Sequence, residues 1–346
     1  METVQIAETP AMVNHPLPGP IPSAQSSVRT GALRIAAFFC VVVAALFLTD
    51  SLVNAGLRRI RTSSFGVTNR IVNGQINADI LVTGSSRAQV HYDPQVIREV
   101  TGRSAFNIGI NGSQTDLQVA MLKVYLAHNR KPELIIHNLD LYSFQTTREI
   151  YDPAQYLPYL RENHVYEAIR RVYPADAWKW KWLPLYGYAT QDLRFTWING
   201  PKALVGLQPR ETHRNGYTPR YLEWTGDFEK LRDSHAAGVT FEIEPQGVRD
   251  LEEIPQLCQQ HGIPLILVYS PEYIEMQELE QNRDEIFSVF RKIAERYNSK
   301  LWDYSSSQIS QEKRFFYNSQ HLNAAGAATY SNSISARLRD EHFGEG

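Results

Sequence analysis

Two serines and a histidine are the side chains of this chain whose types and settings could support nucleophilic catalysis. Ser85 and Ser86 follow a glycine at the end of the apolar run "ILVT", where a buried strand should end. A serine hydroxyl becomes a good nucleophile only when a base removes its proton. His321, in the segment "YNSQHLNAAGA", has a suitable pKa for that base. Asn318 could orient the imidazole, but an amide does not neutralise the imidazolium as a carboxylate does, so we expect a slower enzyme.

The same region of the sequence also allows structural interpretations. Ser86 could be the N-cap of a helix, where serine is favoured, and His321 could be an ordinary residue at the start of another helix. Arg87 could bind an anionic or carbonyl group of a ligand, but we favour an ion pair with Asp140 or another acid. Asp303, which follows a later strand, could supply the carboxylate that is missing beside the histidine.

Two further segments fall where strands should end. The first, "NIGING", ends at Gly112, and its glycines allow backbone N–H groups to point at a ligand. The second, "HNLDLYSF", contains Asn138, Asp140 and Tyr142. Because ligands of parallel sheets bind outside the carboxyl ends of the strands, we expect these segments to meet the serines at one edge of the sheet.

Short apolar strands alternate with helical patterns along much of the chain. We expect strands at 80–83, 104–110, 133–139, 262–270 and 300–305. We expect helices at 93–102, 115–129, 246–261, 282–297 and 322–337. Such alternation predicts an α/β fold, with a parallel sheet covered by helices on both faces.

The stretch 143–245 interrupts this alternation and is rich in aromatic and basic residues. We interpret it as a helical insertion over the functional edge of the sheet. It could be a cap that stabilises the domain or a lid that shapes a substrate cleft, and insertions at such edges commonly do both. We expect Trp178–Trp182 and Arg210–Tyr217 to border the cleft.

The four strand-end segments, in this order, resemble those of the SGNH/GDSL hydrolase superfamily. The resemblance is closer to its membrane-anchored bacterial members associated with surface polysaccharides. It covers about residues 77–338, with a poor match over the insertion. It implies a three-layer α/β/α flavodoxin-like fold, a serine nucleophile, an oxyanion glycine and asparagine, and an Asp-x-x-His block. No cofactor is implied.

Residue by residue, the resemblance assigns the nucleophile to Ser86, with Ser85 in place of the usual aspartate. It assigns the base to His321 and one oxyanion donor to Gly112. Two departures weaken the implied activity. Asn318 replaces the superfamily's aspartate.

The second departure is in the third block, which has no Gly-x-Asn-Asp. A simple alignment places Tyr142 at the oxyanion asparagine, and Asn138 and Asp140 lie nearby. We expect Asn138 to be the side chain that donates to the oxyanion.

An uncharged apolar segment at 35–48 predicts a helix that crosses a membrane, because a helix apolar on every side has no polar face for solvent. We expect a disordered tail at 1–32, an anchor at 33–53, a polar connector at 54–76 and a globular domain at 77–340. A cleaved signal peptide is the alternative.

The orientation of the anchor is contested by two arguments. Arginines after the segment favour a cytoplasmic domain under the positive-inside rule. The resemblance implies the opposite side, so we expect a single-pass protein of the bacterial inner membrane with an extracytoplasmic domain. The oligomeric state is left open.

Composition excludes some classes of protein. Lys and Arg total 35 against 37 for Asp and Glu, so no basic excess indicates a nucleic-acid partner. No clustered His, Cys or Asp pattern has zinc-ligand spacing, and "GSSR" lacks the features of a phosphate loop. The two cysteines, Cys40 and Cys258, are not expected to form a disulfide. We expect no metal and no cofactor.

Two functions from different classes follow. The first is a serine esterase or O-acyltransferase that acts on acyl groups, such as acetyl, of a cell-surface or exported polysaccharide. The second is a weakly active or inactive member of the fold that binds polysaccharide or assists its assembly. The distance between Ser86 and His321 distinguishes them, because catalysis needs the two side chains within hydrogen-bonding reach.

Overall fold

The structure, a computed structural model, describes residues 24–189 and 193–341. The chain divides into two units, Met1–Leu48 and Thr49–Gly346. Helix α1 (Ala24–Leu57) accounts for the described part of the first unit, and its stretch Val28–Leu57 is long and apolar enough to cross a membrane, with a mean hydropathy of 2.4. Most of the tail expected at 1–32 lies outside the described residues, but its last residues belong to α1.

A five-stranded parallel sheet lies at the centre of the second unit. Its strands are β1 (Ile80–Thr83), β2 (Ala105–Asn107), β3 (Leu134–Leu139), β4 (Leu265–Tyr269) and β5 (Lys300–Asp303). Their order is β2-β1-β3-β4-β5, which confirms the α/β, flavodoxin-like fold class. Every residue of the first four strands is buried, which explains their continuous apolar runs.

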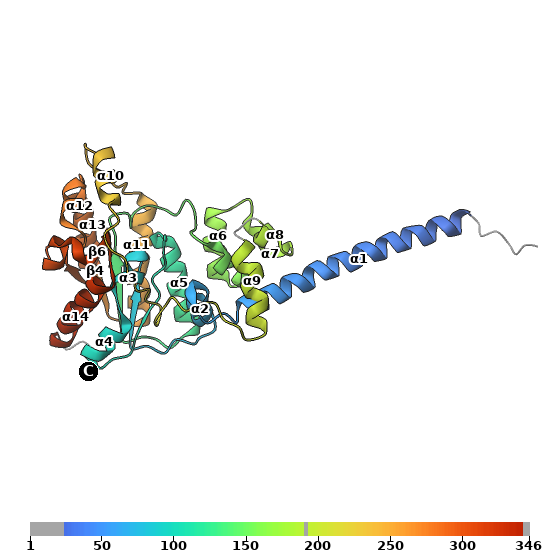
Figure 1. Cartoon of the computed structure of the whole chain (residues 1–346), viewed down its shortest axis with the longest axis horizontal. Coiled ribbons are helices and arrows are strands. Elements are labelled where there is room, and N and C mark those ends of the chain that lie inside the picture. The colour runs from blue at the N-terminus through green and yellow to red at the C-terminus, as the bar shows by residue number, and fades with distance from the viewer. Residues whose placement is uncertain (1–23, 190–192, 342–346) are drawn as a thin grey trace, which may run out of the picture. The chain divides into compact units, whose positions relative to one another are not determined.

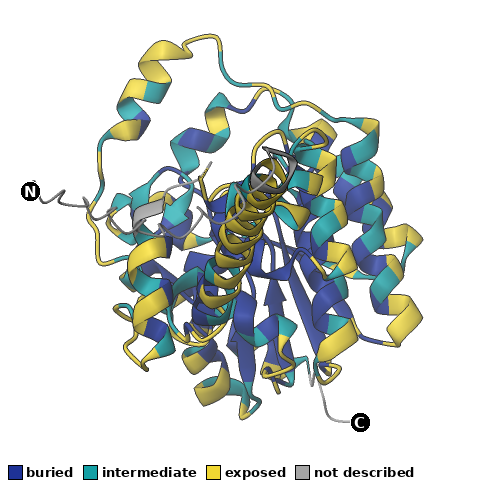
Figure 2. Cartoon of the chain, turned by 90° about the vertical axis from the view of Figure 1, so that its right-hand side faces the viewer, coloured by how far each residue is buried: buried dark blue, intermediate teal, exposed yellow. Residues whose placement is uncertain are grey.

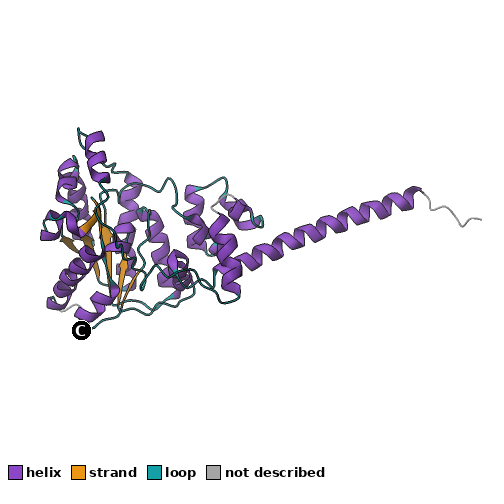
Figure 3. Ribbon diagram, in the orientation of Figure 1, coloured by secondary structure: helices purple, strands orange, loops and turns teal. Residues whose placement is uncertain are grey.

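Helices cover both faces of this sheet (Figures 1 and 3). Helices α5 (Thr115–His128), α11 (Pro245–His261) and α13 (Arg283–Arg296) share one core with alternate strand residues such as Leu81 and Ile135. Helices α4 (Pro94–Thr101) and α14 (Ala324–Asp340) share a second core with the intervening residues, such as Val82 and Ile136. The strands therefore form the most buried layer of the unit (Figure 2).

Helices also occupy the insertion after β3. They are α6 (Asn163–Val172), α7 (Ala177–Trp182), α8 (Tyr186–Ala189), α9 (Leu193–Leu204) and α10 (Asp227–Ser234), preceded by 3-10 turns at Pro153–Gln155 and Leu157–Tyr159. Between β4 and α14 the chain forms α12 (Ile274–Leu279), 3-10 turns at Gln308–Gln311 and Lys313–Phe315, and a hairpin of β6 (Phe316–Asn318) and β7 (His321–Leu322).

The connector expected at 54–76 is instead part of the folded unit. It contains the end of α1 and helix α2 (Ser63–Val72). Leu57, Ile60, Phe65 and Ile71 are buried in the same core as α5. These four residues share no helical spacing, because Leu57 ends α1, Ile60 follows that helix, and Phe65 and Ile71 belong to α2, so the sequence pattern showed only a polar stretch. The compact unit therefore begins before residue 54, at Thr49.

Candidate active site

The turn between β1 and helix α3 (Ser86–His91) presents Ser86 at the sheet edge. Gly84 has a φ of 136°, and a Cβ at this position would lie 3.0 Å from the carbonyl oxygen of Asn138. Ser85 is the N-cap of α3, because its Oγ accepts a hydrogen bond from the backbone N–H of Arg87 at 3.2 Å. The capping role therefore belongs to Ser85 and not to Ser86, whose hydroxyl remains available for another partner.

That partner is His321. The Ser86 Oγ and the His321 Nε2 lie 2.8 Å apart, although 235 residues separate them in the sequence. His321 lies on β7, in a hairpin that the chain forms immediately before α14. The structure therefore places the expected nucleophile and the expected base within direct hydrogen-bonding reach.

Asn318 holds the other side of the imidazole. Its Oδ1 lies 2.9 Å from the His321 Nδ1 and also accepts hydrogen bonds from the backbone N–H groups of Gln320 and His321, at 3.1 and 2.9 Å. A backbone N–H only donates, so the amide atom that receives it must be oxygen. The neutral imidazole therefore carries its proton on Nδ1 and offers the lone pair of Nε2 to the Ser86 hydroxyl.

The surroundings of His321 favour its neutral form. Burial, together with the cationic Arg87 and Arg220, lowers the pKa of His321 to about 3. The Tyr317 ring stacks on the imidazole with the ring centroids 5.4 Å apart. The base is therefore unprotonated at neutral pH, but its proton affinity is low for a general base, whose best pKa is near the working pH.

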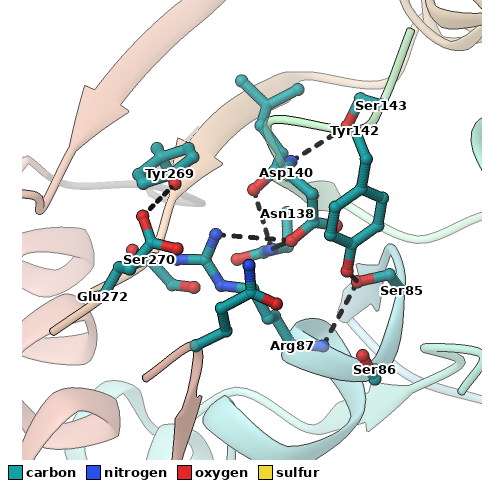
Figure 4. Close-up of polar contacts among 12 residues, drawn as sticks. Ser85, Ser86, Arg87, Asn138, Asp140, Tyr142, Ser143, Tyr269, Ser270 and Glu272 are labelled. Carbon is teal, nitrogen blue, oxygen red and sulfur yellow. Dashed lines mark hydrogen bonds and ion pairs between the residues drawn. The ribbon is translucent and has the colours of Figure 1, made fainter. Parts of the chain in front are cut away.

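Tyr142 lies opposite the serines, across the point where the strand order reverses between β1 and β3. Its hydroxyl is 3.2 Å from the Ser85 Oγ (Figure 4). Burial, and then the charge of Asp140, raises the pKa of Tyr142. The phenol is therefore protonated and can donate a hydrogen bond to an oxygen that gains negative charge beside Ser86.

Asn138 does not fit the oxyanion role that the sequence suggested. It is fully buried, and its Oδ1 accepts a hydrogen bond from the Tyr92 hydroxyl at 2.8 Å. Its Nδ2 donates to the Leu139 carbonyl at 3.0 Å and faces Asp140 Oδ1 at 3.4 Å. The amide is committed within the protein because Asn138 belongs to the buried strand β3 and not to the loop after it.

Arg87 is buried, and its guanidinium points towards Asp140 and Ser270 (Figure 4). It is 1% exposed, its Nη1 lies 3.4 Å from Asp140 Oδ1, and its Nη2 donates to the Ser270 carbonyl at 2.5 Å. Burial disfavours its charge, but Tyr269, Glu272 and Asp140 hold the pKa of Arg87 above its ordinary value. Burial raises the pKa of Asp140 to about 6, against the opposing charge of Arg87. This contact is the ion pair that we favoured from the sequence.

A cleft of about 1050 Å³ reaches the neighbourhood of the pair. Gly112, with a φ of 65°, lines it, as do Arg220 and Gln89, which lies one helical turn after Ser86 on α3. Ser86 and His321 themselves do not line this cleft. Ser86 is 8% exposed. The backbone N–H of Gly112 thus lies in a segment that a ligand of the cleft can touch.

The insertion borders the cleft through one of its two expected segments. Thr212 and His213, within Arg210–Tyr217, line the cleft, but no residue of Trp178–Trp182 does so. The latter segment forms α7, and its Trp180 lines a different, smaller cavity. We expected both segments at the cleft because they follow the carboxyl end of the third strand, and for Trp178–Trp182 that prediction was wrong.

Asp303 does not replace the carboxylate that is missing beside His321. It is exposed at the end of β5, and its Oδ1 accepts hydrogen bonds from the backbone N–H and the hydroxyl of Ser305. Asn318 alone among these candidates contacts the imidazole Nδ1. Within the described ranges, no group of three or more His, Cys, Asp or Glu residues is arranged to hold a metal ion.

Two residues near the site were not predicted from the sequence. His91 lies on α3, is fully buried, and accepts a hydrogen bond from the backbone N–H of Leu322 through its Nε2. Arg220 belongs to the insertion, and its carbonyl accepts from the backbone N–H of Ala324 at 2.8 Å. The spacing of His91, five residues after Ser86, was the only available hint for the first residue.

No family model matches the chain, and no curated protein matches its sequence. Some solved structures are similar to it at low TM-scores. A GDSL-like lipase from Bacteroides thetaiotaomicron is 9% identical over 80% of this chain and 100% of its own, with a TM-score of 0.35. An acetylxylan esterase from Geobacillus stearothermophilus is 15% identical over 77% of this chain and 95% of its own, with a TM-score of 0.35. The chemistry of the site therefore rests on the residues of this chain.

Proposed function

We propose that this protein is a membrane-anchored serine esterase or O-acyltransferase of the SGNH type, acting on acylated polysaccharide of the cell surface. The observation that carries the proposal is the 2.8 Å contact between the Ser86 Oγ and the His321 Nε2. The orientation of the imidazole by Asn318 supports it, because the tautomer leaves Nε2 free to accept the serine proton.

The proposed reaction proceeds through an acyl-enzyme. The Ser86 oxygen attacks the ester carbonyl while its proton moves to the His321 Nε2. The carbonyl oxygen gains negative charge, which the Tyr142 hydroxyl and the backbone N–H of Gly112 stabilise. The C–O bond of the ester breaks and His321 returns the proton to the departing sugar oxygen. Water or a second hydroxyl then attacks the acyl-serine by the reverse proton path.

The proposed substrate class is supported by the lining of the cleft. Aromatic rings provide flat apolar faces, and amide, carboxyl and imidazole groups provide hydrogen-bond partners, a combination suited to sugar rings. The aromatic members include Tyr151, Tyr156, Tyr173 and Phe195, and the polar members include Gln89, Asn111, Asp152 and His213.

The proposed location is the bacterial inner membrane, with one spanning helix and the domain on the extracytoplasmic side. The length and apolar character of Val28–Leu57 support the span. The side of the domain rests on where an acylated surface polysaccharide is found. A reporter fused to the C-terminus, active only in the cytoplasm, would contradict this side of the membrane if it were active.

A second candidate function is favoured by Asn318. An amide in place of a carboxylate leaves the imidazolium without a neutralising charge, which in serine proteases lowers kcat by about 10⁴. A chain with this change could retain the cleft and bind polysaccharide without turning it over. This alternative predicts no acyl-enzyme.

The deciding experiment uses the purified full-length protein and a fluorophosphonate probe, which labels activated serines. We expect the wild type to be labelled, with the adduct on Ser86 by mass spectrometry, and Ser86→Ala to be unlabelled. Ser306→Ala is the matched control, since Ser306 is an exposed serine after β5. An unlabelled wild type that also fails to cleave simple acetyl esters would leave the binding role as the better account.

A further inference from the structure

Large apolar side chains that face solvent gather in one part of the second unit. Seven of them fall between residues 178 and 207, on α7, α9 and the adjoining loops: Trp178, Trp182, Leu183, Trp197, Ile198, Val205 and Leu207. Among the described residues after Leu222, no large hydrophobic side chain is exposed. Trp182 is 62% exposed, although tryptophan side chains are highly buried on average. Such a concentration marks an interaction surface.

The helices that carry this surface pack on the last turns of α1. Asp50 Oδ1 accepts a hydrogen bond from the backbone N–H of Leu185 at 2.9 Å, and the Tyr188 hydroxyl donates to Asn54 Oδ1 at 2.7 Å. All four residues belong to the second unit. Because Asp50 and Asn54 lie within a few residues of the uncharged apolar segment 35–48 in the sequence, these contacts are made next to the part of the chain expected to cross a membrane.

The close fit between α1 and α9 makes this arrangement specific. A Cβ at Gly56 would clash with the carbonyl oxygen of Gly200, so only glycine allows the two helices to approach. The Arg59 guanidinium also donates to the Leu204 carbonyl at 3.1 Å. Helix α9 therefore packs directly on the last turns of α1.

Cationic side chains accompany the apolar ones. A cavity of about 260 Å³ beside α1 is lined by Arg58, Arg161 and Lys181. Asp50, the one carboxylate of its lining, already accepts from the Asn54 side chain and the Leu185 N–H. Arg58 also donates to the Pro158 carbonyl, so Arg161 and Lys181 are the cations that we assign to a ligand. The Lys181 ammonium lies 5.8 Å from the ring centroid of the exposed Trp182. Tryptophan, with lysine or arginine near it, is the composition of a protein surface at the headgroup level of a bilayer.

We propose that a surface of exposed apolar side chains is immersed in the headgroup region of the bilayer that α1 spans. This surface, the membrane seat, consists of Trp178, Trp182, Leu183, Trp197 and Ile198. The cations Arg161 and Lys181, which line the 260 Å³ cavity, then contact the phosphates of anionic lipids. The inference rests on the membrane anchoring in the proposed function.

The membrane seat also touches the cleft through α9. Phe195 and Thr196 line the 1050 Å³ cleft, and the next two residues, Trp197 and Ile198, belong to the seat. Immersion of the seat would therefore hold one wall of the cleft near the bilayer surface, where an acylated polymer still attached to a lipid would be presented.

Quenching of tryptophan emission by brominated lipid tests the proposal. The full-length protein is reconstituted into vesicles of phosphatidylcholine and phosphatidylglycerol whose acyl chains carry bromine near the headgroup. We expect strong quenching for the wild type and loss of most of the quenchable emission for Trp178→Phe/Trp182→Phe/Trp197→Phe. Trp224→Phe/Trp302→Phe is the matched control and should retain it, since Trp302 is 2% exposed.

Charge is tested on the same vesicles. Arg161→Gln/Lys181→Gln should weaken the increase of quenching that phosphatidylglycerol produces, whereas Lys230→Gln on α10, a side chain that is 82% exposed, should not.

Extraction with alkaline carbonate reports the anchor separately. A protein that resists extraction while the triple tryptophan variant is quenched like the wild type would refute the seat but not the anchor. A protein that carbonate releases would refute both.

Discussion

His91 Nε2 accepts a hydrogen bond from the backbone N–H of Leu322, the residue after His321, at 3.0 Å. His91 lies on α3, the helix that begins with Ser86, and its Nδ1 donates to the Ser270 Oγ at 2.8 Å. One buried imidazole therefore ties the helix of the nucleophile to the strand of the base. Burial, with the charge of Arg87, lowers the pKa of His91 well below its ordinary value, so Nε2 keeps its lone pair for the Leu322 N–H.

Replacement of His91 should disturb the pair without touching substrate. We expect His91→Leu to lower kcat by about 10–100-fold with little change in KM, because the distance between Ser86 and His321 is no longer held and a misplacement of about 1 Å has this effect. The buried N–H of Leu322 is left without an acceptor, which costs about 1–3 kcal/mol of stability. His91→Gln, whose Oε1 can accept the same bond, should recover part of kcat. Equal kcat for the two variants would show that His91 has no positioning role.

Tyr142 provides a test of the oxyanion donor. Tyr142→Phe removes only the hydroxyl that lies beside Ser85 and Ser86. We expect kcat for ester cleavage to fall by about 10²-fold with KM nearly unchanged, since the donor acts on charge that develops in the transition state. Thermal unfolding of the variant should stay close to that of the wild type. Full activity in Tyr142→Phe would mean that backbone N–H groups suffice.

Buried histidines should make the fold sensitive to acid. Burial lowers the pKa of His137 to about 3, whereas an unfolded histidine titrates near 6.5. Between these values the unfolded chain binds more protons, so the free energy of unfolding falls as pH drops below 6.5, by about 1.4 kcal/mol per pH unit for this group. Asp140 acts in the opposite direction, because its folded pKa of about 6 lies above its ordinary value of 3.8.

The check is denaturant unfolding of the detergent-solubilised protein from pH 7 to pH 4. His137→Phe should show a smaller loss of stability on acidification than the wild type, because one titrating group has been removed from the interior. His261→Phe, at the exposed end of α11, is the matched control for loss of an imidazole. Identical pH dependence for His137→Phe and the wild type would contradict the assignment.

The sheet and the two ends of the reacting pair could be predicted from local patterns. Ser86 follows a strand that is apolar at every position but its last, and the carboxyl ends of parallel strands share one edge. His321 precedes a long helix with clear periodicity. Segments far apart in sequence were therefore expected at one place, and the structure puts the two side chains 2.8 Å apart.

The rest of the site depended on contacts that no local pattern encodes. Asn138 has the residue type of an oxyanion donor, but it lies on the buried strand β3, where Tyr92 and Asp140 occupy its amide. Tyr142 lies after the strand, where a side chain can turn towards Ser86. Arg220 belongs to the insertion, where strands and helices do not alternate regularly. Its position near His321 therefore depends on tertiary packing and could not be predicted from the sequence.

Asn318 sets the strength of the base and gives the sharpest test of catalysis. Asn318→Asp keeps the size of the side chain and all three hydrogen bonds that Oδ1 accepts. A carboxylate beside Nδ1 favours the imidazolium, so the pKa of His321 should rise from about 3 towards the ordinary histidine range. Acyl-enzyme formation should then become faster at neutral pH, by up to about 10⁴-fold on the precedent of the serine proteases.

The pH profile of Asn318→Asp distinguishes this cause from a general improvement of the protein. In the wild type the base is neutral from mildly acidic to alkaline pH, so kcat/KM should have no acidic limb near the ordinary histidine pKa of about 6.5. In the variant, kcat/KM should start to fall at a higher pH than in the wild type as the solution is acidified, because the imidazole of the variant is protonated more readily.

An active variant with an unchanged rate and profile would mean that the proton is accepted elsewhere than at His321. Asp303 is not that group, since its carboxylate is bonded to Ser305. If wild type and Asn318→Asp are both inert towards acyl esters and the serine probe, the 2.8 Å contact is a structural hydrogen bond and the cleft serves binding.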